Sequence, residues 1–176
     1  MKKFFLLFFF LFPFIAQAKI YILIDEASER KFPIAVPQFV NEGGGQNELT
    51  QEITSLLKKD LTLAGYFKVL DETQFVEKDK DKDQIDFAKW TAIEAHGLVK
   101  GLVGDAGSGK SVLEMRLYDT DSQKLLVGKQ YIFSKKDYPT AVHRFMDELM
   151  NALTGTRGPF SSRIVAACGK TGARQI

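Results

Sequence analysis

A helix-forming segment between two short strand-forming runs constrains the fold of this chain more than any other feature. From Asn47 onward, apolar residues recur at helical spacing while charged and polar residues occupy the opposite face. Gly65 follows the last apolar residue and predicts the C-terminal cap. Apolar runs precede and follow the helix at residues 32–40 and 66–70. This order predicts a βαβ-like unit.

Two prolines restrict the first of these strands. Pro33 and Pro37 each lack a backbone N–H donor, so the run over residues 32–40 is either an edge strand or a strand with an irregularity. Three glycines at residues 43–45 then allow the chain to turn toward the helix.

The rest of the chain predicts three more strands and two more helices. A short helix fits residues 86–96 with Gly97 as its stop, strands fit residues 98–103, 112–118 and 125–133 as a meander, and a last helix runs from Pro139 to Gly155. The large apolar residues on the inward faces form the expected core: Leu57, Leu61, Phe67, Trp90, Phe145 and Leu149. An α/β domain with one hydrophobic core is therefore expected.

The first 18 residues have the features of a secretory signal peptide. Lys2 and Lys3 give a positive start, an apolar run extends to Ile15, and Ala16-Gln17-Ala18 has the small-x-small pattern of a signal peptidase site. The run is too short for a stable membrane span, which needs roughly 20 apolar residues. We expect cleavage after Ala18, and no integral membrane segment after cleavage.

Charge and cysteine content narrow the classes of partner. The chain has 24 basic and 22 acidic side chains, and loss of Lys2 and Lys3 leaves equal numbers. A formally neutral protein gives no indication of a nucleic-acid or anionic-membrane surface. Cys168 is the single cysteine, so no internal disulfide is expected, and Lys19 stands where a bacterial lipoprotein would carry its lipid-bearing cysteine. These observations favour a periplasmic protein.

An apolar arm follows the expected cleavage site. Residues 20–24 are all apolar, and residues 26–31 after them are mostly polar. The run is either an extended arm over residues 19–30 that adds a strand to a partner, or an edge strand of the domain's own sheet. The candidate partner-binding residues are Lys19, Ile20, Tyr21, Ile22, Leu23, Ile24 and Asp25.

One stretch matches a nucleotide-binding motif letter for letter. Residues 104–111, from Gly104 to Ser111, satisfy G-x-x-x-x-G-K-[ST]. That site needs a helix directly after Lys110, so that backbone N–H groups and the helix dipole face the phosphates. A strand with alternating faces follows instead. We therefore interpret the motif as a hairpin tip, and expect no nucleotide or other cofactor.

Other site patterns are incomplete. The aspartates at 79, 81 and 83 resemble the start of a calcium loop, but Gln84 and Trp90 stand where glycine and glutamate are required, so a solvated loop over residues 77–86 is expected. The two histidines, His96 and His143, lie on separate predicted helices without the companions of a zinc site. No catalytic constellation and no metal site is predicted.

Several sequence segments in a fixed order resemble the TolB family of the Tol-Pal system. They are Pro33–Phe39, Leu61–Asp71, Asp86–Trp90, Gly97–Gly101 and, most specific, Leu153–Val165 with the sequence LTGTRGPFSSRIV. The resemblance covers essentially the whole chain. It implies a signal peptide at 1–18, an amino-terminal domain at 19–158, and a linker with the remnant of a first β-propeller strand at 159–176, truncated before the propeller.

The resemblance also implies a fold and a function. The fold is α/β, with a mixed β-sheet and helices packed on one face, similar to an anticodon-binding domain. The function is that of a non-enzymatic periplasmic adaptor, whose arm binds the carboxy-terminal domain of TolA and supports outer-membrane integrity and constriction during cell division. The surface that binds Pal belongs to the propeller and is expected to be missing. The alternative is another exported α/β interaction module of an envelope assembly or secretion system, without Tol partners.

Overall fold

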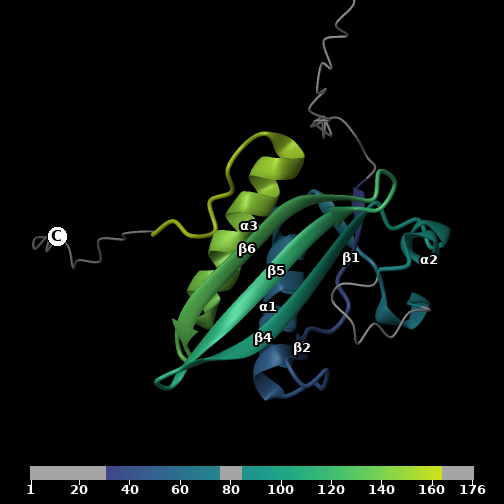
Figure 1. The fold of residues 1–176 in the computed structure, drawn as a ribbon. Helices are drawn as coiled ribbons and strands as arrows, with labels where there is room; N and C mark the ends of the chain where they lie inside the picture. The colour runs from purple at the N-terminus through teal and green to yellow at the C-terminus, as the bar shows by residue number, and fades with distance from the viewer. Residues whose placement is uncertain (1–30, 76–84, 164–176) are drawn as a thin grey trace, which may run out of the picture.

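The computed structural model describes residues 31–75 and 85–163 (Figure 1). The elements in chain order are β1 (Phe32–Ala35), β2 (Val40–Asn41), α1 (Glu48–Ala64), β3 (Phe67–Val69), a 3₁₀ turn (Glu72–Gln74), α2 (Phe87–Ala92), β4 (Gly97–Gly107), β5 (Lys110–Asp119), β6 (Lys124–Ser134) and α3 (Tyr138–Thr154).

The strands form one mixed sheet. Its order is β3-β1-β4-β5-β6, with β2 also paired to β4. The pairings of β1 with β3 and β4, and of β2 with β4, are parallel, whereas β4, β5 and β6 form an antiparallel meander. The parallel pairing of β1 with β3 through α1 is the predicted βαβ unit. The α/β fold class is therefore confirmed.

The proline-containing run is an interrupted inner strand. The edge-strand alternative is wrong, because β3 and β4 pair with the two sides of β1. Pro33 is tolerated because β4 begins only at Gly97, and the Pro33 carbonyl accepts a hydrogen bond from His96 N at 3.1 Å. Pro37 lies in the break between β1 and β2, where Phe39 N donates to Thr54 Oγ1 at 3.0 Å instead of to a strand.

Local sequence signals determine where the long helices begin and end. Asn47 caps α1, since its side chain accepts from Thr50 N at 2.9 Å and the Thr50 hydroxyl accepts from Asn47 N at 2.9 Å. Gly65 and Gly155 end α1 and α3 in the left-handed region, with φ of 79° and 76°. The predicted stops of both helices are confirmed.

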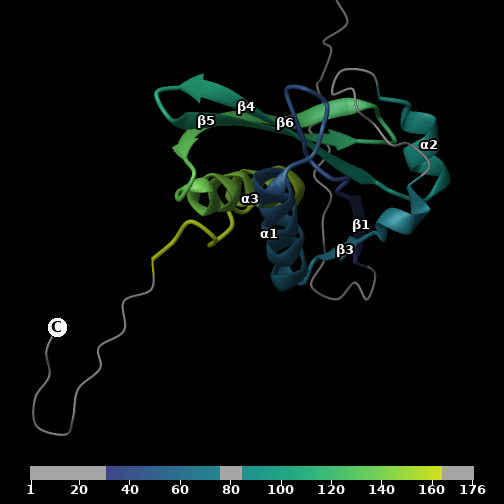
Figure 2. The ribbon, with the colours of Figure 1, turned by 90° about the horizontal axis from the view of Figure 1, so that it is seen from below.

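The helices cover both faces of the sheet unequally. Helices α1 and α3 lie side by side on one face (Figure 2), where they pack with the inward residues of β4, β5 and β6. The short α2 closes a smaller second cluster, which joins Ala35, Leu98 and Tyr118 from the opposite face to Trp90. The six predicted core residues are all buried: Leu57, Leu61, Phe67, Trp90, Phe145 and Leu149.

The structure corrects the predicted limits of α2. The helix ends at Ala92 instead of continuing to residue 96, because Glu94 adopts a positive φ of 58° and turns the chain toward the sheet. Gly97 is consequently the first residue of β4 and not the stop of the helix.

Candidate interaction surface

The predicted arm lies outside the described residues. The structure does not describe residues 1–30, so the role of Lys19 to Asp25 stays a prediction. The described chain enters the sheet at Phe32, which begins an inner strand with neighbours on both sides. The expected loop at 77–86 and the expected propeller remnant at 159–176 likewise fall largely outside the described part.

The nucleotide-like motif forms the tip of a β-hairpin. Strand β4 ends at Gly107, β5 begins at Lys110, and these two residues are paired across the turn. The Asp105 carboxylate accepts a hydrogen bond from Gly107 N at 2.8 Å, which is ordinary turn chemistry. The prediction that a strand follows Lys110 is confirmed, so this segment does not present a helix N-terminus to a phosphate.

The two histidines lie apart and each contacts a carboxylate. His96 Nδ1 lies 2.7 Å from Asp121 Oδ2 at the surface. His143 Nε2 lies 3.5 Å from Asp60 Oδ2 between α3 and α1. Burial raises the pKa of Asp60 above its ordinary value, although His143 opposes this shift. Across residues 31–75 and 85–163, no three His, Cys, Asp or Glu side chains cluster as a metal site would require.

The free edge of β6 is the main candidate for binding a partner. One side of this 11-residue strand pairs with β5, and within the described chain no strand pairs with the other side. Such an edge presents unpaired N–H and C=O groups that another extended chain can use. Three of its apolar side chains are exposed, namely Leu125, Leu126 and Ile132.

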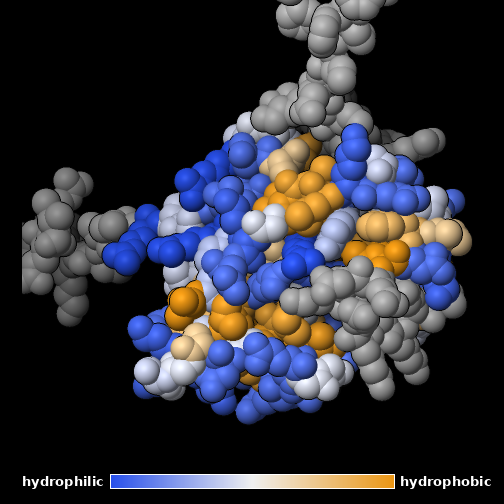
Figure 3. Space-filling view, in the orientation of Figure 1, coloured by the Kyte–Doolittle hydropathy of each residue, from blue (hydrophilic) through white to orange (hydrophobic). Residues whose placement is uncertain are grey.

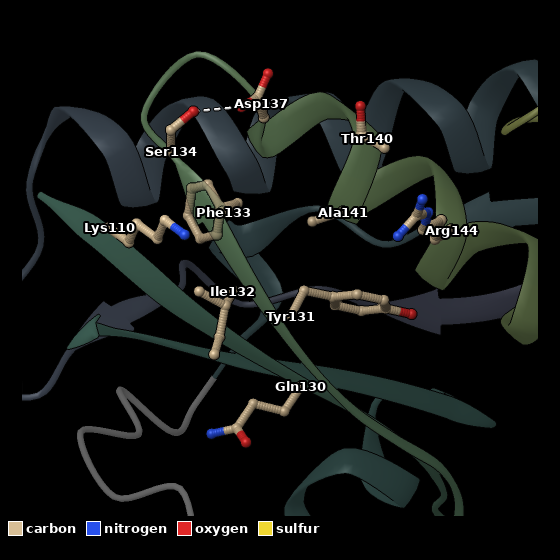
Figure 4. Close-up of a pocket in the computed structure, with 10 residues that line it drawn as sticks. All are labelled: Lys110, Gln130, Tyr131, Ile132, Phe133, Ser134, Asp137, Thr140, Ala141 and Arg144. Atoms are coloured by element: carbon tan, nitrogen blue, oxygen red, sulfur yellow. Dashed lines mark hydrogen bonds between the residues drawn. The ribbon is translucent and has the colours of Figure 1, made fainter. Parts of the chain in front are cut away.

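A pocket of about 470 Å³ lies beside the last half of β6 (Figure 4). Its walls come from β6 and from the first turns of α3, with Lys110 at the start of β5 completing them. Figure 4 shows Lys110 near one end and Arg144 near the other, with Phe133 and Ala141 between them. The pocket therefore combines an apolar floor with a cation at either end.

The phenol of Tyr131 also lines this pocket. Burial, followed by the nearby Glu148 carboxylate, raises the pKa of Tyr131 to about 12. The group consequently stays protonated and can donate a hydrogen bond at any physiological pH. Tyr131 and Arg144 thus supply a neutral and a charged donor in one pocket.

The face of the sheet opposite α1 and α3 has apolar surface in several separate areas. Figure 3 shows these hydrophobic areas with hydrophilic side chains between them. The strand register places Val112 beside Ile132 at the hairpin end and Tyr118 beside Leu125 at the α2 end. Between them lies Glu114, which forms an ion pair with Arg116.

The end of the described chain folds back onto α3. Asp147 is 1% exposed, and its carboxylate accepts hydrogen bonds from Phe160 N at 2.8 Å, from Ser161 N at 3.1 Å and from the Ser161 hydroxyl. A Cβ on Gly158 would lie 2.9 Å from Asp147 Oδ1, so a larger residue would displace this carboxylate. These contacts explain physically the GPFS part of the most specific sequence segment.

A second family segment also has a packing explanation. The Phe39 ring lies where a Cβ on Gly101 would be, so the sheet accepts this aromatic side chain only over a glycine. Phe39 is 1% exposed in the core between the sheet and the helices. Both segments therefore have a packing explanation.

The comparisons with known proteins agree with the fold. The family described as TolB amino-terminal domain matches residues 20–126. The Tol-Pal system protein TolB of Syntrophotalea carbinolica is 32% identical over 133 residues, covering 73% of this chain and 30% of that protein. The protein of the same name from Dinoroseobacter shibae is 32% identical over 158 residues, covering 88% and 35%.

A solved structure shows the same fold. TolB from Acinetobacter baumannii superposes with a TM-score of 0.63 at 24% identity, covering 76% of this chain and 31% of that one. The chain spans about a third of the length of the curated relatives it matches. Among the described helices, none has both the length and the hydropathy required to cross a membrane. The family match, which includes more than half of the residues, shows that the chain belongs to the TolB amino-terminal domain family.

Proposed function

We propose that this chain is a non-enzymatic periplasmic adaptor of the Tol-Pal system that binds the carboxy-terminal domain of TolA through residues 19–25. The observation that carries the proposal is the family match over residues 20–126, which begins inside the apolar arm and continues into β6. In this role the chain supports outer-membrane integrity and constriction during division. Pal binding is not part of the proposal.

The entry of the chain into the sheet supports the role of the arm. Both sides of β1 are paired, and the arm ends only a few residues before Phe32. The arm is therefore not needed to complete the pairing of β1. An apolar extended segment next to a sheet can satisfy its backbone donors on the sheet edge of another protein.

The described residues support a binding role in preference to catalysis. The motif that suggested a nucleotide forms a hairpin, and the two histidines lie at separate places with one carboxylate each. A nucleophile, a base and an orienting group in mutual contact would instead indicate an enzyme.

Proline scanning of the arm tests this proposal. We would purify the chain expressed with its own leader and measure capture of the TolA carboxy-terminal domain. A strand added to TolA alternates its bonded residues, so one of the two variants Ile22→Pro and Leu23→Pro should weaken capture by at least about tenfold more than the other. Ser28→Pro, outside the apolar run, is the control and should retain capture.

Circular dichroism of each variant completes the experiment. Unchanged spectra with lost capture place the effect in the arm. Equal capture by the wild type and both arm variants would contradict the TolA assignment, as would failure of the wild type to capture TolA. Loss of secondary structure in both arm variants would show that the arm belongs to the domain's own sheet.

A further inference from the structure

We propose that the free edge of β6, with the pocket beside it, receives an extended acidic segment of a partner protein as an added strand. This site is distinct from the arm of the proposed function. Strand β6 forms one edge of the sheet and β3 forms the other, so the site lies at the edge opposite β3.

The backbone of β6 provides the docking edge. Ten residue pairs join β6 to β5, from Lys110 with Ser134 to Asp119 with Lys124. In such a ladder every second residue turns its N–H and C=O groups away from the paired strand. An edge of this length exceeds the five or six residues of a typical strand, so it can hold a partner segment through main-chain hydrogen bonds.

The pocket would receive side chains of the added strand. Phe133 and Ala141 provide apolar contact, and the Tyr131 phenol provides a donor. Lys110 and Arg144 form no ion pair with another described residue. The acid among the lining residues, Asp137, is hydrogen-bonded to the Ser134 hydroxyl. Two cations and a neutral donor in one pocket match carboxylates on the incoming strand.

The same charges argue against a second copy of this chain at the edge. Lysines 124 and 129 lie on β6, and Lys135 and Lys136 follow it directly. Pairing two β6 edges would bring these ammonium groups together, and lysines on an edge strand are a known protection against such pairing. Lys129 forms an ion pair with Glu148 at 3.8 Å, but this pair is solvent-exposed and therefore weak. An acidic strand would turn this repulsion into attraction.

The apolar side chains at the two ends of β6 extend the contact. Ile132 is 68% exposed and Leu125 is 53% exposed, and both lie on the face opposite α1 and α3. A strand alongside β6 would cover one flank of each. Partial cover of exposed apolar side chains adds to the main-chain hydrogen bonds.

Two synthetic peptides of about nine residues test the site. In one, valine and threonine alternate with glutamate, and in the other glutamate is replaced by lysine. Each is added to the isotopically labelled full chain while the backbone amides are followed by NMR. We expect the glutamate peptide to shift and protect the amides of residues 124–134 and to bind at least about tenfold more tightly than the lysine peptide.

Charge reversal gives the decisive variant. Lys110→Glu combined with Arg144→Glu should reverse the preference, so that the lysine peptide binds more tightly. The control variant combines Lys31→Glu with Lys68→Glu, two exposed residues near the opposite edge of the sheet. It changes the net charge by the same amount and should leave the preference for the glutamate peptide unchanged. If the reversed variant loses its amide dispersion, Lys110→Ala with Arg144→Ala replaces it and should abolish the preference.

Several outcomes would overturn the proposal. Equal affinity for the two peptides, or shifts confined to residues outside both β6 and the pocket walls, would exclude an acidic strand at this edge. Free glutamate or inorganic phosphate that shifts the same amides at the same concentration would show a small-anion site instead. A gain of more than about tenfold in peptide affinity on deletion of residues 19–24 would show that the chain's own arm occupies the edge.

Discussion

Replacement of Asp147 by alanine should release the last described segment from α3 and destabilise the domain. Asp147 is 1% exposed, and its carboxylate accepts hydrogen bonds from two backbone amides and one hydroxyl of residues 160–161. Phe160 packs against the core beside it. Alanine removes all three acceptor contacts and loosens this packing.

The expected loss follows from the type of these hydrogen bonds. A hydrogen bond to a charged group contributes about 1.5 to 3 kcal/mol, but the freed amides regain water when the segment detaches. We therefore expect a loss of about 2 to 4 kcal/mol in the free energy of unfolding, less than the sum of three bonds. Domains of this size are stable by only about 5 to 15 kcal/mol, so the effect is easily measured.

Urea unfolding followed by circular dichroism measures this loss. Glu148→Ala is the matched control, because the neighbouring carboxylate makes only long ion pairs, at 3.8 Å to Lys129 and 3.9 Å to Arg157. Its expected cost is about 0.5 kcal/mol or less. Asp147→Asn retains one acceptor and should lie between the two. Trypsin cleavage after Arg157 should also accelerate in Asp147→Ala. A urea midpoint for Asp147→Ala no lower than that of Glu148→Ala would refute the reasoning.

Three further predictions concern other parts of the domain. Asp60→Asn should raise the urea midpoint at pH 7 and lose this advantage near pH 3. Burial raises the folded-state pKa of Asp60 above 3.8, so the carboxyl group stabilises the fold when protonated, and this contribution is lost as the pH rises through the folded pKa; asparagine is neutral at both pH values. Leu57→Ala should cost about 2 to 5 kcal/mol in urea unfolding, since the side chain is 0% exposed; an unchanged midpoint would contradict the assigned helix face. Lys110→Ala should not change a calorimetric titration with Mg-ATP, in which the wild type also shows no micromolar binding.

Local sequence signals predicted much of the fold because they act within a few residues. The spacing of Ile53, Leu57 and Leu61 determines the buried face of α1, and Gly65 ends the helix. The alternation in β5 likewise separates buried Leu113 from the opposite face. These elements require no knowledge of the partners they pack against.

Long-range pairing could not be predicted in the same way. That β1 tolerates Pro33 as an inner strand depends on β4 starting at Gly97, which lies far along the chain. A register shift in β6 pairs Leu117 with Val127 but Tyr118 with Leu125, which turns Leu125 to the face opposite the main core. The sequence contained one partial signal, since β6 is apolar on both of its faces. The exposed edge itself depends on the complete strand order.

The evidence for the family and the evidence for the β6 edge are therefore independent. The specific family segments correspond to packing requirements: Phe39 over Gly101 in the sheet, and Gly158 against Asp147 at the end of α3. A chain can satisfy these requirements and keep the fold whatever surface it presents to partners, because buried contacts and exposed edges are under separate physical constraints. Membership of the family thus supports the fold directly. The acidic-strand proposal depends instead on the unpaired edge, the pocket and the two cations, Lys110 and Arg144, and it can fail without changing the assignment of the family.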